Sequence, residues 1–264
     1  MRSCRSCRSP SEARRGREGF GMLPFFKKVR EAQRPRCAAL VAAAGSSQRM
    51  GGINKLLQPL DGVPVLVRTL TALQFAGGVD EIVIAAREED ILEISQLCRT
   101  YGIAKCTKVV RGGESRVHSV LLAALEAAPE TELLAVQDGA RPLVSPELID
   151  RVISAAARCS AAAPAIAVKD TMKTFRDGGA VEETLDREHL RAVQTPQVFQ
   201  AGLLKAALQS TLEQEVPVTD DASAVERLGK VVFLVEGEEE NLKITTPLDL
   251  VIAEAILRAR EDGR

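Results

Sequence analysis

The stretch CAALVAAAGSSQRMGGINK, Cys37–Lys55, combines two features that decide the fold. Residues 37–43 form a short apolar run of the kind that becomes a buried strand. The segment 42–55, AAAGSSQRMGGINK, follows as a loop of small residues that carries two cations, Arg49 and Lys55. It resembles a phosphate-binding loop, although it matches neither GxxxxGK[ST] nor GxGxxG. The pattern predicts a strand that leads into an anion-binding loop.

Apolar runs alternate with amphipathic segments along the rest of the chain. After the first run, strands are expected at residues 80–86, 105–110, 132–138, 161–168 and 230–237. Helices are expected at residues 63–77, 89–102, 115–128, 146–159, 200–212, 220–229 and from 246 onward. Strands that alternate with helices and are apolar throughout are typical of a parallel sheet covered on both faces. We therefore predict an α/β fold with a Rossmann-like, doubly wound, mainly parallel sheet.

Residues 169–194, KDTMKTFRDGGAVEETLDREHLRAVQ, interrupt this alternation because they are too polar for the core. They suggest two short strands around a turn at residues 177–179, and hence a protruding β arm. Arms of this kind often pack on a second subunit, so we expect a homodimer. The sequence shows no internal repeat, and we predict a single domain over residues 36–260.

Charge is distributed unevenly between the beginning of the chain and the rest. Residues 1–36 hold 11 Lys and Arg against 3 Asp and Glu, whereas the other 228 residues hold 24 against 33. We predict that residues 1–35 form a disordered basic extension. Its arginines and serines resemble a transit peptide, but Glu12 and Glu18 count against one, which leaves plastid-type targeting open.

Composition argues against several classes of protein. No run of 18 apolar residues exists, which predicts no membrane span. The chain has no Trp and one Tyr, too few aromatics for a platform that stacks single-stranded nucleic acid. Six cysteines in 264 residues favour reduced thiols and a cytoplasmic location over a disulfide scaffold. The two histidines lie in unrelated contexts, which argues against a Ser-His-Asp set.

The loop after the first strand is the first candidate for chemistry. Small residues at Ala43, Ala44 and Gly45 allow backbone N–H groups to approach an anion closely. Arg49 and Lys55 add positive charge, and polyphosphate is the natural target. The alternative is a tight strand–helix turn with two solvated cations.

A second candidate set follows later strands. Asp138 ends an apolar strand, where a carboxylate needs a cation or a metal, and it is an oxygen ligand that suits Mg²⁺. Arg141 could hold an anionic group or simply pair with Asp138. Lys243 lies just past another strand end, and the backbone of residues 111–120 could bind a base edge or form a plain helix cap.

Seven motifs, in order and spacing, resemble the 2-C-methyl-D-erythritol 4-phosphate cytidylyltransferase family of the non-mevalonate isoprenoid pathway. They span about Cys37 to Leu257 and are AAAGSSQRMGGINK, GGESRVHSV, VQDGARP, KDTMK, LRAVQTPQVF, VTDDASAVE and ENLKITTPLDL. The resemblance implies a homodimeric nucleotidyltransferase. It would use Mg²⁺ to convert CTP and methylerythritol phosphate into 4-diphosphocytidyl-2-C-methyl-D-erythritol and pyrophosphate.

The resemblance also implies a role for individual residues. Catalytic cations would be Arg49, Lys55 and Lys243. CTP would contact Ala43, Ala44, Gly45, Gly113, Glu114, Ser119 and Asp138, the last also holding the metal. Methylerythritol phosphate would contact Thr171, Arg187, Thr195 and Thr219, and Arg141 is the further candidate on the substrate side. Glu114 stands where the family usually has aspartate, which preserves the carboxylate but changes its reach.

Two other functions remain as alternatives. Ribitol 5-phosphate cytidylyltransferases share the loop, QTPQ and NxKIT elements, but the segments DTMK and DDASAVE resemble the methylerythritol enzyme more closely. A non-catalytic nucleotide-binding module would tolerate the loss of cations near the α-phosphate, yet Arg49, Lys55 and Lys243 are all present.

Overall fold

A computed structural model describes residues 34–45 and 54–263 of the chain. The chain divides between Arg34 and Pro35, and all the elements below belong to the part that follows. Its strands are β1 (Cys37–Ala43), β2 (Pro59–Leu60), β3 (Val63–Pro64), β4 (Glu81–Ala86), β5 (Cys106–Arg111), β6 (Leu133–Asp138), β7 (Ala161–Ala167), β8 (Lys173–Phe175), β9 (Val181–Thr184), β10 (Arg191–Val193), β11 (Gln197–Gln200) and β12 (Phe233–Glu236). Its α-helices are α1 (Val65–Phe75), α2 (Ile91–Thr100), α3 (Arg116–Glu126), α4 (Pro146–Cys159), α5 (Ala201–Glu213), α6 (Asp221–Arg227) and α7 (Pro247–Glu261), with 3₁₀ turns at Glu88–Asp90 and Arg187–His189.

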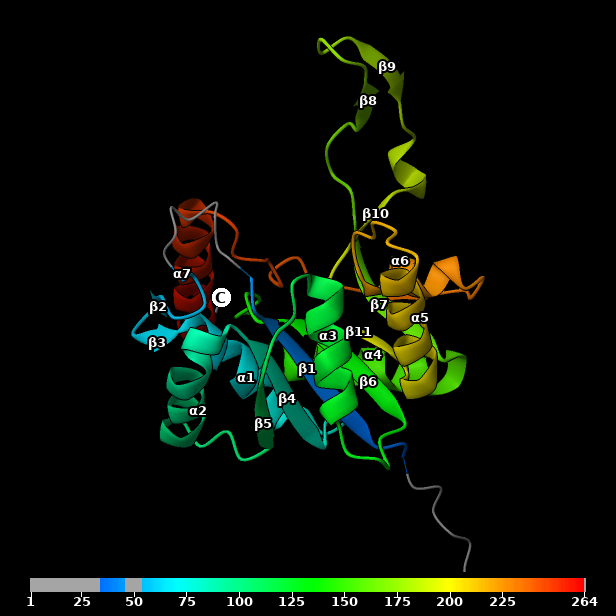
Figure 1. Cartoon of the computed structure of the whole chain (residues 1–264). Coiled ribbons are helices and arrows are strands. Elements are labelled where there is room, and N and C mark those ends of the chain that lie inside the picture. The colour runs from blue at the N-terminus through cyan, green and yellow to red at the C-terminus, as the bar shows by residue number, and fades with distance from the viewer. Residues whose placement is uncertain (1–33, 46–53, 264) are drawn as a thin grey trace, which may run out of the picture. The chain divides into compact units, whose positions relative to one another are not determined.

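The main sheet has eight strands in the order β10-β7-β11-β6-β1-β4-β5, with β12 paired to β7 (Figure 1). The pairs β1–β4, β1–β6, β4–β5 and β7–β12 are parallel, whereas β11 and β10 pair with their neighbours antiparallel. The chain runs from β1 to β4 on one side and later returns to β6 on the other. The carboxyl ends of β1 and β6 therefore form a topological switch point, where ligands bind in doubly wound sheets.

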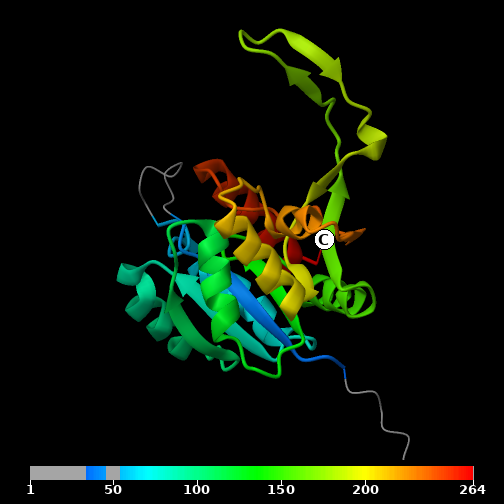
Figure 2. The ribbon, with the colours of Figure 1, turned by 45° about the vertical axis from the view of Figure 1, so that its right-hand side comes forward.

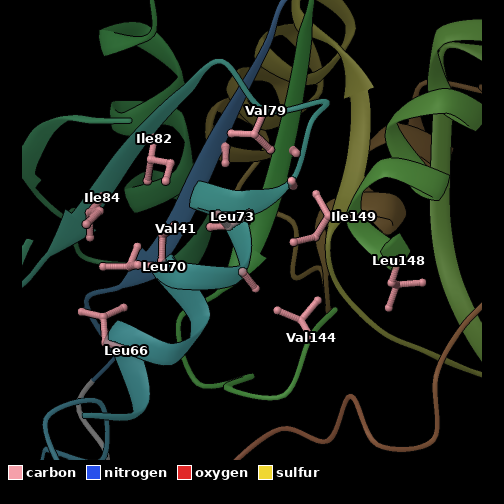
Figure 3. Packing of buried hydrophobic residues seen from close by; sticks show 14 of the residues in the cluster. Val41, Leu66, Leu70, Leu73, Val79, Ile82, Ile84, Val144, Leu148 and Ile149 are labelled. Carbon is pink, nitrogen blue, oxygen red and sulfur yellow. The ribbon is translucent and has the colours of Figure 1, made fainter. Parts of the chain in front are cut away.

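The predicted α/β class with a mainly parallel sheet is confirmed. Helices cover both faces because the strands are apolar on both sides. In β1, Ala39 and Val41 pack on one face with α1 and α4, whereas Ala38 and Leu40 pack on the other with α3 and α5. Figure 3 shows the first of these two cores, where side chains from α1 meet those of β1, β4 and α4. These two layers hold the strand ends rigidly, and that rigidity positions the site.

The region predicted as a β arm is a hairpin of β8 and β9. Its turn uses Gly178 and Gly179, both with positive φ, which glycine adopts without strain. Figures 1 and 2 show the hairpin extending beyond the ends of β7 and β10, away from the helices that cover the sheet. Its strands pair only with each other among the described residues. The prediction of two short strands around this turn is confirmed.

Two features of the fold were not expected from the sequence. The first is β11, a four-residue strand between β6 and β7 that is too short and too close to Pro196 to stand out. The second is the β2–β3 hairpin, whose turn residues Asp61 and Gly62 both have positive φ, as a two-residue hairpin requires. The helix expected at 63–77 consequently begins at Val65.

Some predictions fall on residues that the structure does not describe. The extension predicted at residues 1–35 lies almost wholly outside the described residues. Arg49, predicted as a catalytic cation, also lies outside them. Among residues 34–45 and 54–263, no helix combines the length and apolarity needed to cross a bilayer.

Candidate active site

The carboxyl end of β1 brings the small-residue loop to the switch point. Ala42 pairs with Asp138 of β6, and Ala43 pairs with Ala86 of β4. Ala44 and Gly45 line a pocket of ≈ 370 Å³ at this edge of the sheet. The side chain of Ala43 instead packs in the core, so any contact that it makes with a ligand has to come from its backbone.

Two lysines reach the same pocket from distant parts of the sequence. Lys55 follows the loop, and its Nζ donates a hydrogen bond to the carbonyl oxygen of Ile244 at 2.9 Å. The neighbouring Lys243 places its Nζ 2.8 Å from Oδ2 of Asp138. The backbone N–H of Ile244 in turn donates to the carbonyl of Ala140. The segment after β12 is therefore fixed beside β6, and it brings Lys243 and Lys55 to one side of the pocket.

Asp138 is the buried carboxylate at the centre of the site. Its Oδ2 lies 2.8 Å from Lys243 Nζ and 3.5 Å from Arg141 Nε, and its Oδ1 lies 3.6 Å from Arg116 Nη2. Burial raises the pKa of this carboxyl, but the positive charges of Lys243, Arg116 and Arg141 outweigh burial and hold the pKa below its ordinary value. Asp138 is therefore an anion at neutral pH, surrounded by cations.

The loop before α3 closes the opposite side of the pocket. Gly112 packs so tightly against the loop after β1 that a Cβ there would lie 2.5 Å from Cβ of Ala44. The N–H of Gly113 donates to Ser119 Oγ at 3.0 Å, and the Ser119 hydroxyl donates to the Ser115 carbonyl at 2.8 Å. These bonds order the turn at Gly113, where the backbone faces the pocket with Glu114.

The pocket unites most residues predicted for the nucleotide. Its lining includes Ala44, Gly45, Lys55, Gly113, Glu114, Ser119, Asp138 and Lys243. They come from segments up to 199 positions apart, between Ala44 and Lys243. One site is formed from four stretches of the chain: the loop after β1, the start of α3, the end of β6 and the segment after β12.

Arg141 and Thr195 lie beneath the pocket and do not line it. Both are buried, and Arg141 Nη1 donates to the carbonyl of Asn241 at 2.6 Å. The hydroxyl of Thr195 accepts a hydrogen bond from the backbone N–H of Asp138 at 3.1 Å. Of the two possibilities for Arg141, the structure shows the pairing with Asp138.

Three residues predicted for the second substrate lie apart from the pocket lining. Thr171 and Arg187 are exposed on the segment that carries the arm, and Thr219 is exposed just before α6. Arg187 donates through Nη1 to the carbonyl of Lys169 at 2.8 Å, which leaves the rest of its guanidinium facing solvent. The structure does not bring these residues together with Lys55 and Lys243.

Two charged residues beside the site, Arg116 and Asp221, were not predicted from the sequence. Arg116 lines the pocket, and it forms a 2.7 Å ion pair with Asp221, which is wholly buried. A signal for Asp221 existed, because Asp221, Ala224 and Val225 follow the i, i+3, i+4 spacing of a buried helix face. A carboxylate on that face needs a cationic partner.

The side chains at the pocket fit a metal ion that is held mainly by the phosphates of a nucleotide and only in part by the protein. Among the described residues, no three His, Cys, Asp or Glu side chains gather into a metal cluster. Asp138 nevertheless supplies an ionised oxygen ligand at the pocket, and Mg²⁺ commonly uses one or two carboxylates together with substrate phosphates. The residues present are compatible with a Mg²⁺ ion that arrives with a nucleotide.

A glycine loop and two lysines at the switch point of a doubly wound sheet define a nucleotide-binding α/β protein. Comparison with known proteins narrows this class. A family model described as IspD, 2-C-methyl-D-erythritol 4-phosphate cytidylyltransferase, matches residues 37–259. The chain belongs to this family of nucleotidyltransferases.

Individual relatives agree with the family model. The chain is 43% identical over 229 residues to the enzyme of that name from Pelotomaculum thermopropionicum, an alignment that covers 86% of this chain and 96% of the relative. It is 45% identical over 223 residues to the enzyme of that name from Microcystis aeruginosa, and this alignment covers 84% of this chain and 98% of the relative. The crystal structure of 4-diphosphocytidyl-2C-methyl-D-erythritol synthase from Anaerococcus prevotii superposes with a TM-score of 0.76 at 31% identity, covering 85% and 96%.

Proposed function

We propose that this chain transfers a cytidylyl group from CTP to 2-C-methyl-D-erythritol 4-phosphate and releases pyrophosphate, a step of isoprenoid biosynthesis. The observation that carries the proposal is the convergence of Lys55, Lys243 and the ionised Asp138 on one pocket beside a glycine loop. Relatives named for this activity support the choice of substrates, and they favour it over ribitol 5-phosphate.

The reaction requires charge stabilisation more than proton transfer. An oxygen of the methylerythritol phosphate attacks the α-phosphorus of CTP, a new P–O–P bond forms, and the bond between the α-phosphorus and the β-bridging oxygen breaks. The attacking phosphate monoester has a second pKa of about 6, so it is already anionic at neutral pH and needs no general base. Lys55, Lys243 and Arg49 are the cations that would draw the two anions together and stabilise charge on the leaving pyrophosphate.

The nucleotide would lie across the pocket. The backbone of Ala43, Ala44 and Gly45 would face the phosphates, where small side chains permit close approach. Gly113, Glu114 and Ser119, on the opposite wall, would hold the cytosine and ribose. Asp138, between the two walls, would address the ribose and the metal.

We propose that Mg²⁺ is held by Asp138 together with the triphosphate oxygens. When bound, the ion neutralises phosphate charge and polarises the phosphoryl oxygens. Lys243, whose Nζ lies 2.8 Å from Asp138 Oδ2, orients that carboxylate and would contact the same phosphates. Arg141 and Thr195 fix the position of Asp138 from below.

The binding site for the second substrate would be completed by another copy of the chain. Thr171 and Arg187 are exposed on the arm segment, and Met172, Phe175 and Val181 expose apolar surface beside them. We propose that the arm packs on a partner in a homodimer and presents Thr171 and Arg187 to the partner's pocket, where Thr219 also contributes.

The four described cysteines are free thiols, which supports a reducing, cytoplasmic location.

One assay tests the reaction and separates the two polyol substrates. Purified protein is incubated with CTP, Mg²⁺ and either methylerythritol phosphate or ribitol phosphate, and pyrophosphate release is measured. We expect release with methylerythritol phosphate at a kcat/KM well above that for ribitol phosphate. A preference for ribitol phosphate would overturn the substrate assignment. Nucleotide binding without pyrophosphate release would favour a non-catalytic module.

A further inference from the structure

Asp221, the first residue of α6, is an unusual charge for the interior of a protein. Its side chain has 0% of its surface exposed, and its nearest cation is Arg116, with Nη2 at 2.7 Å from Oδ2. Neither carboxylate oxygen has a well-oriented hydrogen bond among the described residues. Burial raises the pKa of Asp221, and the charge of Arg116 only partly opposes this. The carboxylate is thus held in a place that disfavours its charge.

Stability alone does not account for such a residue. Removing two charges from water is expensive, and buried ion pairs often contribute nothing to stability compared with neutral replacements of the same shape. Groups of this kind are common where a site needs a side chain held in one position. The contacts of its partner, Arg116, therefore indicate the role of Asp221.

Arg116 links Asp221 to the nucleotide pocket. It lies at the start of α3 and lines the pocket, and the same Nη2 atom that contacts Asp221 at 2.7 Å lies 3.6 Å from Oδ1 of Asp138. One guanidinium group therefore stands between two carboxylates and lies closer to the buried one. Oδ2 of Asp138 is already paired with Lys243, so Oδ1 is the oxygen with the looser contact.

We propose that Asp221 is a positioning residue of the active site, which holds Arg116 back from Asp138 and keeps Asp138 Oδ1 available to the nucleotide or its metal. Without the charge of Asp221, Arg116 would close on Asp138 and saturate the carboxylate with cations. The proposal rests on the proposed function in one respect, the role of Asp138 in holding CTP and its metal.

The test compares three variants with the wild-type chain: Asp221→Asn, Arg116→Gln and the double variant. Asp221→Asn keeps the shape and removes the charge, so we expect an unchanged or higher melting temperature. We also expect about tenfold weaker binding of CTP in the presence of Mg²⁺, measured by titration calorimetry, with a rise in KM for CTP that exceeds the fall in kcat. Arg116→Gln leaves the buried carboxylate without its cation, so we expect a lower melting temperature.

The double variant distinguishes positioning from a merely structural role. If the weaker CTP binding of Asp221→Asn comes from Arg116 closing on Asp138, then the double variant, which lacks the guanidinium, should bind CTP more tightly than Asp221→Asn does. It should also have a higher melting temperature than Arg116→Gln, because it no longer buries an unpaired carboxylate. Glu126→Gln is the matched control, because it removes the ion pair of Glu126 with Lys108 at the other end of the same helix. We expect that control to bind CTP like the wild type.

Two results would overturn the proposal. One is an Asp221→Asn variant that binds CTP with Mg²⁺ as tightly as the wild type does. The other is a double variant that binds no better than Asp221→Asn alone. Because the readout is binding, the outcome is separate from the proposed function. A wild-type chain that releases no pyrophosphate would contradict that function while leaving the positioning test intact.

Discussion

The two halves of the proposed site differ in how they are assembled. Residues predicted for CTP converge on one pocket because the strand ends of β1 and β6, the start of α3 and the segment after β12 all meet there. Residues predicted for methylerythritol phosphate are scattered, with Thr171 and Arg187 exposed on the arm segment and Thr195 buried beneath Asp138. The nucleotide half is fixed by packing within one chain. Apart from Thr195, the residues proposed for the other half are exposed in a single chain.

The physical cause of the difference is the environment of each part. The sheet edge is held by two apolar cores, and there the buried carboxylate of Asp138 lies among the cations Lys243, Arg116 and Arg141. The β8–β9 hairpin pairs only with itself among the described residues, and Phe175 on it is 72% exposed. Met172 and Val181 on the same arm are also exposed, and a contiguous group of exposed apolar side chains is typical of a surface that contacts a partner.

The largest effect is expected in the nucleotide half. Lys243→Ala removes a cation that lies 2.8 Å from Asp138 and faces the proposed phosphate site, so kcat should fall by roughly 10²–10³, the size of losing one charge-stabilising donor. Lys55→Ala should behave alike. Steady-state pyrophosphate release measures both, with Lys108→Ala as the control away from the pocket. Turnover near that of the wild type in either variant contradicts the assignment.

A smaller and more selective effect is expected on the arm. Arg187→Ala should raise the KM for methylerythritol phosphate by about 10–100-fold, the equivalent of one or two charge-assisted hydrogen bonds, and leave the KM for CTP unchanged. Arg176→Ala is the control, because Arg176 lies on the same arm, within the β8–β9 hairpin, and pairs there with Glu182. Equal losses in both KM values would show that the arm is not specific to the second substrate.

Phe175→Glu tests the partner surface itself. Burying a phenylalanine side chain is worth about 1.5–3 kcal/mol, so the dimer dissociation constant should rise at least about tenfold. Phe75→Glu is a close control, since Phe75 is 74% exposed on α1, away from the arm. Sedimentation over a range of concentrations measures both. Dimers of equal strength in the two variants would place the interface elsewhere.

The smallest effect concerns the anchor of the segment that carries Lys243. Asp249 accepts hydrogen bonds from the hydroxyl and N–H of Thr245 and the N–H of Thr246. Although burial raises the pKa of Asp249, these bonds together hold it below its ordinary value of 3.8. A lowered pKa means that the stabilisation is present above about pH 4 and is lost as the pH falls through the folded-state value. Asp249→Asn should therefore lower the melting temperature slightly at pH 7 and have less effect at pH 3, with Glu261→Gln, at the other end of α7, as the control.

Sequence patterns predicted the sheet and several residues that line the pocket, because both depend on local signals. Apolar runs identified β1, β4, β5, β6, β7 and β12 to within about three residues, and polar residues after strand ends identified Asp138 and Lys243. The strand β11 was not predicted, because four residues are too few to show a clear periodicity. The ion pair of Arg116 with Asp221 joins positions that are remote in the sequence, and no local pattern reports such a contact. Whether Arg141 faces a ligand or Asp138 likewise depends on tertiary geometry.

The most direct test of a site shared between subunits is complementation. A chain with Lys243→Ala is co-expressed with a chain with Arg187→Ala, each with a different tag, and the mixed dimer is purified through both tags. In a shared site, one pocket of that dimer combines an intact nucleotide half with an intact arm, and the other carries both defects. The account therefore predicts about half of the wild-type pyrophosphate release, although each variant alone is defective. Activity no higher than that of the two variants measured separately would show that each site is formed within one chain, and would contradict the account.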